Sequence, residues 1–143
     1  MGSILLRQYL ASHRIENLGR VVMLGPPNQG SKKADWFKRP ALVRWLSGPN
    51  LSRLGTGADD LPQKLGAADF EVGVIAGDRA LFGWLLGRKI PSDGIVTVES
   101  TKLAGMTDFT IVNCSHSFMP NKRETLVQIG EFIQHGRFRR SDK

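Results

Sequence analysis

The chain has 143 residues, of which 41% are hydrophobic and 23% charged, and its formal net charge at pH 7 is +7. This length suffices for one domain with a real core, and the composition is that of a globular protein rather than a disordered or fibrous one. No apolar run approaches the roughly 18 residues that a membrane-spanning helix needs. The single cysteine, Cys114, excludes a disulfide within the chain.

The basic excess raises the question of a nucleic-acid partner. Basic side chains cluster within residues 32–44 and 137–140, and Trp36, Phe37 and Trp45 lie near the first cluster. A solvated basic face with a polar tail accounts for the same pattern, so we expect no nucleic-acid partner. The first residues lack the basic start and long apolar stretch of a signal peptide, which predicts a cytoplasmic protein.

The first half of the chain predicts a helix and then a strand. Residues 2–14 carry a broad apolar face at helical spacing. Residues 20–24 are short, apolar and rich in β-branched side chains, which is typical of a strand buried on both faces. Residues 30–68 form a variable middle, with a helix expected within 35–46 and several Gly- and Pro-rich breaks.

The second half predicts two further strands and a closing helix. The strands are expected at residues 70–76 and 108–114, and the apolar residues 81–86 between them predict one or two helical turns. For the last helix, Asn121 is the expected N-cap in a capping box with Glu124, and Gly136 is expected to end it. Its expected core face consists of Leu126, Ile129, Phe132 and Ile133.

This order of elements predicts an α/β fold. Short apolar strands joined by helical crossovers form a parallel sheet with helices on its faces. Three parallel strands make a poor free-standing sheet and leave the first strand with an unpaired edge. The sequence therefore indicates half of an α/β domain.

Candidate catalytic side chains follow the predicted strands. His116 comes directly after the third strand, and Asp93 lies in the connection that leaves the second. Functional residues of an open parallel sheet collect at the carboxyl ends of its strands. An imidazole activates a hydroxyl nucleophile by taking its proton, and a carboxylate on the other ring nitrogen orients the ring.

Simpler interpretations stay open for both residues at this point. A histidine after a strand is commonly a polar loop residue, and Asp93-Gly94 is also a typical turn. Asp78 is a rival acid, because it directly follows the second strand.

Several segments resemble the lipase- and esterase-like α/β hydrolases. Residues 19–31, GRVVMLGPPNQGS, are similar to the "V-x-L-G-T-P-H-x-G-S" stretch of strand six in that superfamily. Residues 93–100, DGIVTVES, match its "D-G-x-V-x-x-x-S" acid loop, and residues 115–119, SHSFM, match its histidine loop. The resemblance covers nearly all of residues 1–143, loosely in 30–68, where the family's cap or lid varies most.

The resemblance implies the C-terminal half of an α/β-hydrolase fold, with strands equivalent to six, seven and eight. It implies carboxylic-ester hydrolysis by a Ser-His-Asp triad, with Asp93 as acid and His116 as base. The family's nucleophile lies in a G-x-S-x-G elbow, which this sequence does not contain. Residues 1–10 resemble the continuation of such an elbow, so that Met1 would supply a backbone N–H to the oxyanion hole. The isolated chain is therefore expected to be inactive.

The resemblance also suggests where substrate binds. The residues expected to line an acyl pocket are Pro26, Pro27, Asn28 and Gln29, for which an ordinary tight turn is the alternative. The three aromatic residues within 36–45 would cover a lipid-like substrate, or else are simple packing residues. We expect a small ester or lipid-like substrate and no metal or other cofactor. The alternative function is a truncated interaction module that associates through its exposed sheet edge.

Overall fold

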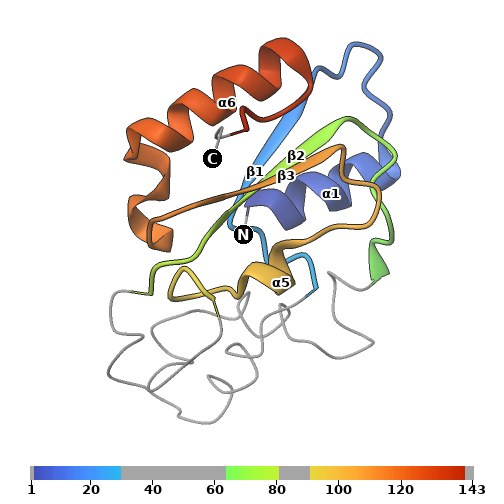
Figure 1. The fold of residues 1–143 in the computed structure, drawn as a ribbon. Helices are drawn as coiled ribbons and strands as arrows, with labels where there is room; N and C mark the ends of the chain where they lie inside the picture. Colours follow the sequence, from blue (N-terminus) through green and yellow to red (C-terminus); the bar gives the residue numbers. More distant parts are fainter. Residues whose placement is uncertain (1, 30–63, 81–90, 141–143) are drawn as a thin grey trace, which may run out of the picture.

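A computed structural model describes residues 2–29, 64–80 and 91–140 (Figure 1). The elements in chain order are α1 (Gly2–Ser12), β1 (Val21–Leu24), β2 (Val72–Gly77), α5 (Val98–Thr101), β3 (Asp108–Val112), the 3-10 helix η3 (His116–Asn121) and α6 (Arg123–His135). The helices expected within 35–46 and 81–86 lie outside the described residues, as do residues 30–63 of the cap expected at 30–68.

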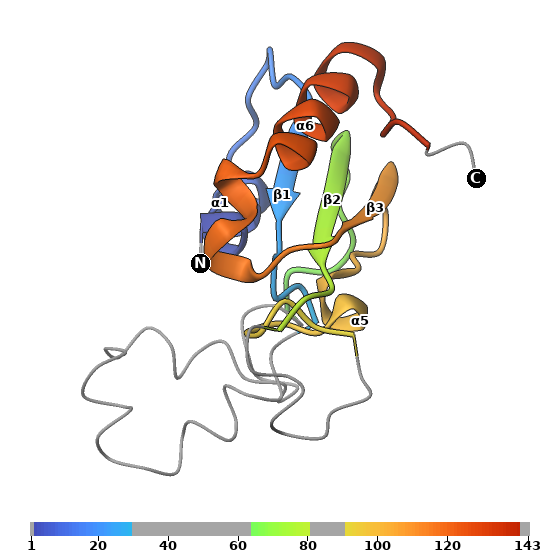
Figure 2. The ribbon, with the colours of Figure 1, turned by 60° about the vertical axis from the view of Figure 1, so that its left-hand side comes forward.

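The three strands form one parallel sheet in the order β1-β2-β3, which confirms the predicted α/β class. Val21 of β1 pairs with Val72, and Gly73 of β2 pairs with Asp108. Every residue of the central strand β2 is buried, as its unbroken apolar pattern predicts. Because the strands run in the same direction, their carboxyl ends share one edge, near which α5 lies (Figure 2).

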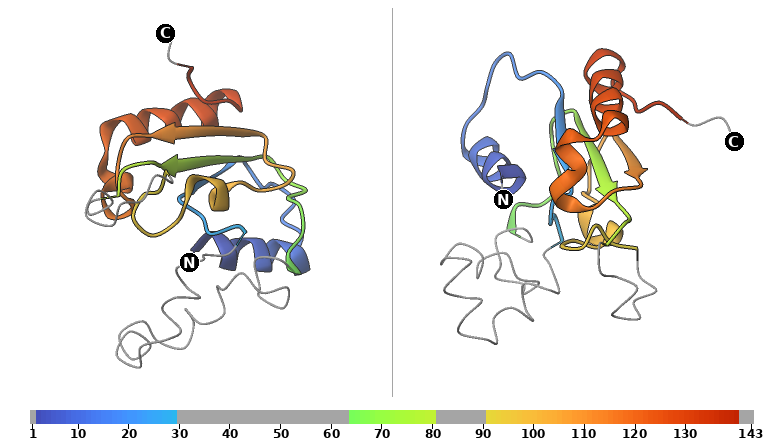
Figure 3. Two further views of the ribbon diagram at one scale, coloured as in Figure 1. Left: turned by 60° about the horizontal axis from the view of Figure 1, so that its bottom comes forward. Right: turned by 90° about the vertical axis from the view of Figure 1, so that its left-hand side faces the viewer.

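Helices cover both faces of the sheet. On one face, α6 packs Phe132 against a core that includes Ile75 and Val112. On the other face, Leu6 of α1 packs against a second core formed around Val74 and Met23. Figure 3 shows α1 and α6 on opposite sides of the strands. Among the helices of the described ranges, none is long and apolar enough to cross a membrane.

The start of α6 differs from its prediction. The helix begins at Arg123 with Lys122 as N-cap, and no side-chain hydrogen bond caps it. The capping box with Asn121 is wrong because Asn121 belongs to η3, the 3-10 helix that also contains Pro120. Gly136 does end the helix as predicted, in a left-handed conformation with φ 70°.

The buried face of α6 is also turned from the predicted one. Of the predicted face, Phe132 is buried and Ile129 packs against the same core, whereas Leu126 and Ile133 are 54% and 51% exposed. Thr125 and Gln128 are buried instead. The segment after the helix folds back, so that the Arg139 backbone exchanges hydrogen bonds with Gln128 and Phe138 packs against Phe132, with ring centroids 5.0 Å apart. The hydrophobic pattern within α6 therefore could not predict these contacts, because the residues that make them follow the helix.

Candidate active site

Asp93 lies in a tight loop at the carboxyl edge of the sheet. An isolated bridge between Ser92 and Thr97 closes the loop, and the Asp93 N–H donates to the carbonyl of Val96 at 3.1 Å. Gly94 makes the turn with φ 103°. Thr97 then caps α5 by accepting a hydrogen bond from the Ser100 N–H. These backbone contacts help to fix the position of the Asp93 backbone.

Asp93 and His116 form a hydrogen-bonded pair. His116 Nδ1 lies 2.6 Å from Asp93 Oδ2. The His116 backbone N–H also donates to the Asp93 carbonyl at 2.9 Å, so two bonds join the residues. The carboxylate is fully buried, whereas the imidazole is 34% exposed. A carboxylate only accepts hydrogen bonds, so Nδ1 is the donor, and in a neutral imidazole Nε2 is then the acceptor.

The second carboxylate oxygen of Asp93 binds its own loop. Oδ1 accepts hydrogen bonds from the N–H groups of Ile95 and Val96, at 2.8 and 2.7 Å. With Oδ1 held by the backbone, Oδ2 is aimed at the imidazole. An acid that orients a histidine is expected to bind the ring with one oxygen while its own position is fixed by other contacts.

Asp78 does not compete for His116. Its side chain accepts a hydrogen bond from the Asn113 amide at 3.1 Å, and the residue is exposed. Of the two acids that the sequence leaves open, the structure brings Asp93 to the histidine. The catalytic role of the pair stays a prediction.

Two glycines lie directly against this pair. A Cβ built on Gly25 would be 2.8 Å from Asp93 Oδ2, and one on Gly77 would be 2.8 Å from Asp93 Cβ. Both glycines come at the carboxyl ends of strands, β1 and β2, where close approach of a side chain requires an absent Cβ. Their position after apolar runs marks strand ends in the sequence but does not reveal this close approach.

The turn after β1 is held by buried polar contacts. Pro26, Pro27 and Asn28 are buried, and the Asn28 amide donates to the Thr101 carbonyl at 2.8 Å. Asn28 Oδ1 accepts a hydrogen bond from Arg7 at 3.2 Å.

Gln29, the last of the four predicted pocket residues, is exposed. Its N–H donates to the Ser100 carbonyl at 3.0 Å. These contacts anchor the turn to α5, and the substrate-pocket role of all four residues stays a prediction.

Arg7 is a buried residue that the sequence analysis missed. Its guanidinium donates to Asn28 and to the Gly66 carbonyl, the latter at 2.7 Å, and burial lowers the pKa of Arg7. Arg7 lies in a helix whose sequence pattern is amphipathic, and nothing in the neighbouring residues predicts that its side chain is buried.

Among the described residues, no hydroxyl or thiol side chain is hydrogen-bonded to His116 as a nucleophile would be. Its ring makes a hydrogen bond to Asp93 and to no other side chain in these ranges. Cys114 lies two residues away but is buried, and burial raises the pKa of its thiol. The reactive form of cysteine is the thiolate, which this environment disfavours.

The structure does not describe two predicted parts of the site. Met1, the predicted oxyanion donor, and the aromatic residues within 36–45 lie outside the described residues. Within the described ranges, no three His, Cys, Asp or Glu side chains gather as a metal site would require.

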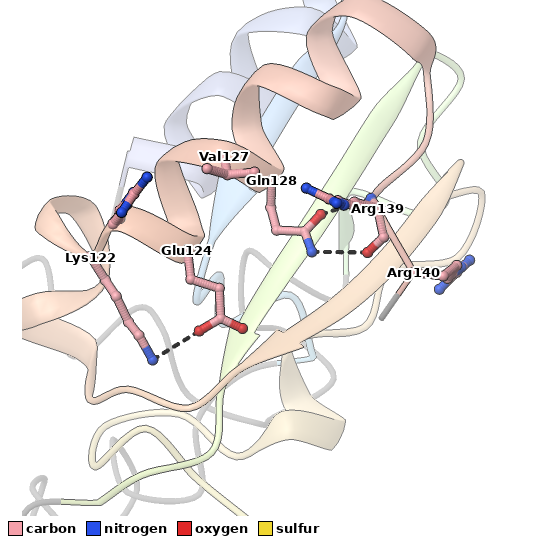
Figure 4. A pocket seen from close by; sticks show the side chains of 7 residues that line it. Lys122, Glu124, Val127, Gln128, Arg139 and Arg140 are labelled. Carbon is pink, nitrogen blue, oxygen red and sulfur yellow. Dashed lines mark hydrogen bonds and ion pairs between the residues drawn. The ribbon is translucent and has the colours of Figure 1, made fainter. Parts of the chain in front are cut away.

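A separate hollow lies between α6 and the segment that follows it (Figure 4). It is lined by Lys122, Arg123, Glu124, Val127, Gln128, Arg139 and Arg140, and so contains neither residue of the pair. Lys122 and Glu124 form an ion pair across 3.0 Å. The Gln128 amide exchanges two hydrogen bonds with the Arg139 backbone, at 3.0 and 2.9 Å, so this region joins the chain end to α6.

No protein-family model and no curated protein matches the chain. Among solved structures, it is similar to the lipase BlEst2 of Bacillus licheniformis in two forms. The mature form is 21% identical over 73% of this chain, with a TM-score of 0.47. The propeptide form is 22% identical over 73% of this chain, with a TM-score of 0.48. The similar region spans 54% of the mature chain and 30% of the propeptide form.

The three parallel strands with helices on both faces fit the partial α/β-hydrolase fold that the sequence predicts.

Proposed function

We propose that Asp93 and His116 are the acid and base of a Ser-His-Asp triad that hydrolyses carboxylic esters. The observation that carries this proposal is the 2.6 Å contact between His116 Nδ1 and the buried carboxylate of Asp93. A surface ion pair or a chance loop contact does not require a fully buried carboxylate with both oxygens engaged.

In this proposal each group of the triad has its own step. His116 Nε2 takes the proton of the serine hydroxyl as its oxygen attacks the ester carbonyl, and then returns that proton to the departing alcohol. Water attacks the acyl-enzyme in the same way and releases the acid. Asp93 keeps the Nδ1 tautomer and stabilises the positive charge on the ring during both transfers.

The nucleophile is the part that this sequence does not provide. No G-x-S-x-G occurs in the 143 residues. Loss of a triad nucleophile lowers turnover by about 10⁶. The chain by itself should therefore hydrolyse esters negligibly, even with the proposed acid and base in hydrogen-bond contact.

Two measurements test this proposal. The 143-residue chain should neither cleave p-nitrophenyl esters nor react with a fluorophosphonate serine probe. The coding sequence immediately upstream of Met1 should extend the reading frame into a G-x-S-x-G motif. The extended protein should then react with the probe and cleave the esters.

Variants of that extended protein separate the two acids. Asp93→Ala and His116→Ala should lose ester cleavage, whereas Asp78→Ala should retain it. Probe labelling of the 143-residue chain would refute the missing-nucleophile part of the proposal. Full activity of the extended His116→Ala variant would refute the triad.

A second candidate is a non-enzymatic interaction module. In the part of the chain that the structure describes, β1 pairs with β2 on one side and with no strand on the other. Such an edge presents free backbone groups that a second chain can pair with. Analytical ultracentrifugation decides this candidate, since a monomer at all concentrations counts against it.

A further inference from the structure

Gly25 occupies the point where the end of β1 meets the Asp93–His116 pair. A Cβ at this position would lie 2.8 Å from Asp93 Oδ2, 2.9 Å from His116 Nδ1 and 3.0 Å from His116 Cε1. Two of these three atoms are the ones that share the hydrogen bond of the pair. A methyl group at Gly25 would therefore clash with both atoms of this hydrogen bond.

Hydrogen bonds hold the residues on both sides of this contact. The Gly25 N–H donates to the Ile75 carbonyl at 2.8 Å, which ties Gly25 to the central strand. Across from it, Asp93 is held through Oδ1 by the Ile95 and Val96 N–H groups. The His116 backbone is held in turn by the Asp93 carbonyl.

The Gly25 backbone adds a second restriction. Its φ is +51°, in the left-handed region that side chains with a Cβ rarely adopt. A substitution at Gly25 therefore brings two separable effects, backbone strain and contact with the pair. Gly66 provides the matched comparison, because its φ is +63° and a Cβ there would meet nothing within 4 Å.

We propose that Gly25 is a positioning residue for the Asp93–His116 pair: its missing side chain is what lets the carboxylate and the imidazole meet against the end of β1. The inference rests on the pair in the proposed function, but it requires neither the serine nor a substrate. Its test can therefore be made on the 143-residue chain.

The experiment compares Gly25→Ala with Gly66→Ala by NMR of the full chain. In the unchanged protein, the proton that His116 Nδ1 shares with Asp93 should give a far-downfield resonance that is absent from Asp93→Ala. Gly66→Ala should keep this resonance. Gly25→Ala should lose it or shift it strongly, while the amide signals of β2 and β3 remain. An unchanged resonance in folded Gly25→Ala would overturn the inference.

Thermal unfolding provides the answer if Gly25→Ala does not fold. In a background that carries Asp93→Ala and His116→Ala, the contacting side chains are gone and only the backbone strain is left. There, Gly25→Ala should lower Tm by no more than Gly66→Ala does. An equally severe effect of Gly25→Ala with and without the two side chains would show that the pair is not what requires the glycine.

The two proposals fail in different ways. If the unchanged protein shows no downfield resonance that depends on Asp93, the pair itself is wrong and the proposed function fails with it. If that resonance is present and folded Gly25→Ala retains it, only the role of Gly25 is wrong.

Discussion

At the scale of single residues, the Asp93 side chain has two structural tasks. Oδ1 satisfies two backbone N–H groups of its loop, and Oδ2 binds His116. Hydrogen bonds to an ionised carboxylate are stronger than hydrogen bonds between neutral groups. The acid therefore holds together the loop that presents it, which makes its removal a test of structure as well as of chemistry.

Asp93→Ala should lower the free energy of unfolding by about 2–4 kcal/mol, because it removes the buried carboxylate that accepts hydrogen bonds from the Ile95 and Val96 N–H groups. Urea unfolding followed by circular dichroism measures this. The matched control is Asp78→Ala, which removes an exposed carboxylate with a single amide partner and should change the same quantity by no more than about 0.5 kcal/mol. Equal effects of the two changes would contradict the assignment.

At the scale of elements, the strands follow from local sequence and the orientation of α6 does not. The apolar, β-branched run at residues 20–24 predicts a strand, and the structure forms β1 there. Its predicted burial on both faces is wrong, because only Met23 of the strand is buried. The face of α6 depends on Phe138 and on the Arg139 backbone, which return to the helix from beyond its end. No periodicity within α6 contains that information.

In the candidate site, too, some residues can be predicted from local sequence and others cannot. Asp93 and His116 are predictable because each lies in a short recognisable motif after a strand. The contribution of Gly25 is not, because it arises where three segments separated in sequence converge. The choice between Asp93 and Asp78 likewise required the fold, since both acids follow β2 in the chain.

The orientation of α6 leads to a prediction about Gln128. This side chain donates to the Arg139 carbonyl and accepts from the Arg139 N–H, and so holds the segment that carries the buried Phe138. Gln128→Ala should lower the free energy of unfolding by about 1–3 kcal/mol. Chemical denaturation measures the loss.

The control for this change is Gln134→Ala, at an exposed position of the same helix. Both changes replace Gln by Ala within α6, so their helix propensities cancel. A loss at Gln134 as large as that at Gln128 would show that the bonds to Arg139 do not secure the segment.

At the scale of the whole molecule, a chain of contacts runs from α1 to the acid loop. Arg7 binds Asn28 in the turn after β1, and Asn28 binds the Thr101 carbonyl at the end of α5. The start of α5 follows directly from the loop that holds Asp93. The helix at one side of the sheet therefore supports the site at its edge without touching it.

Arg7→Ala should weaken this support. It leaves the Asn28 oxygen and the Gly66 carbonyl without their donor, at a cost of about 2–4 kcal/mol in the free energy of unfolding. It should also loosen the acid loop, and amide hydrogen exchange detects that loosening. The amide to follow is that of Val96, which donates to Asp93.

The comparison that isolates this effect is Gln8→Ala, at the exposed neighbouring position of α1. In Gln8→Ala the Val96 amide should exchange as slowly as in the unchanged protein, and in Arg7→Ala it should exchange faster by more than the overall loss of stability explains. If the Val96 amide follows only the global free energy of unfolding, α1 stabilises the fold but does not support the acid loop. In that case the site depends on its own loop and the strand ends alone.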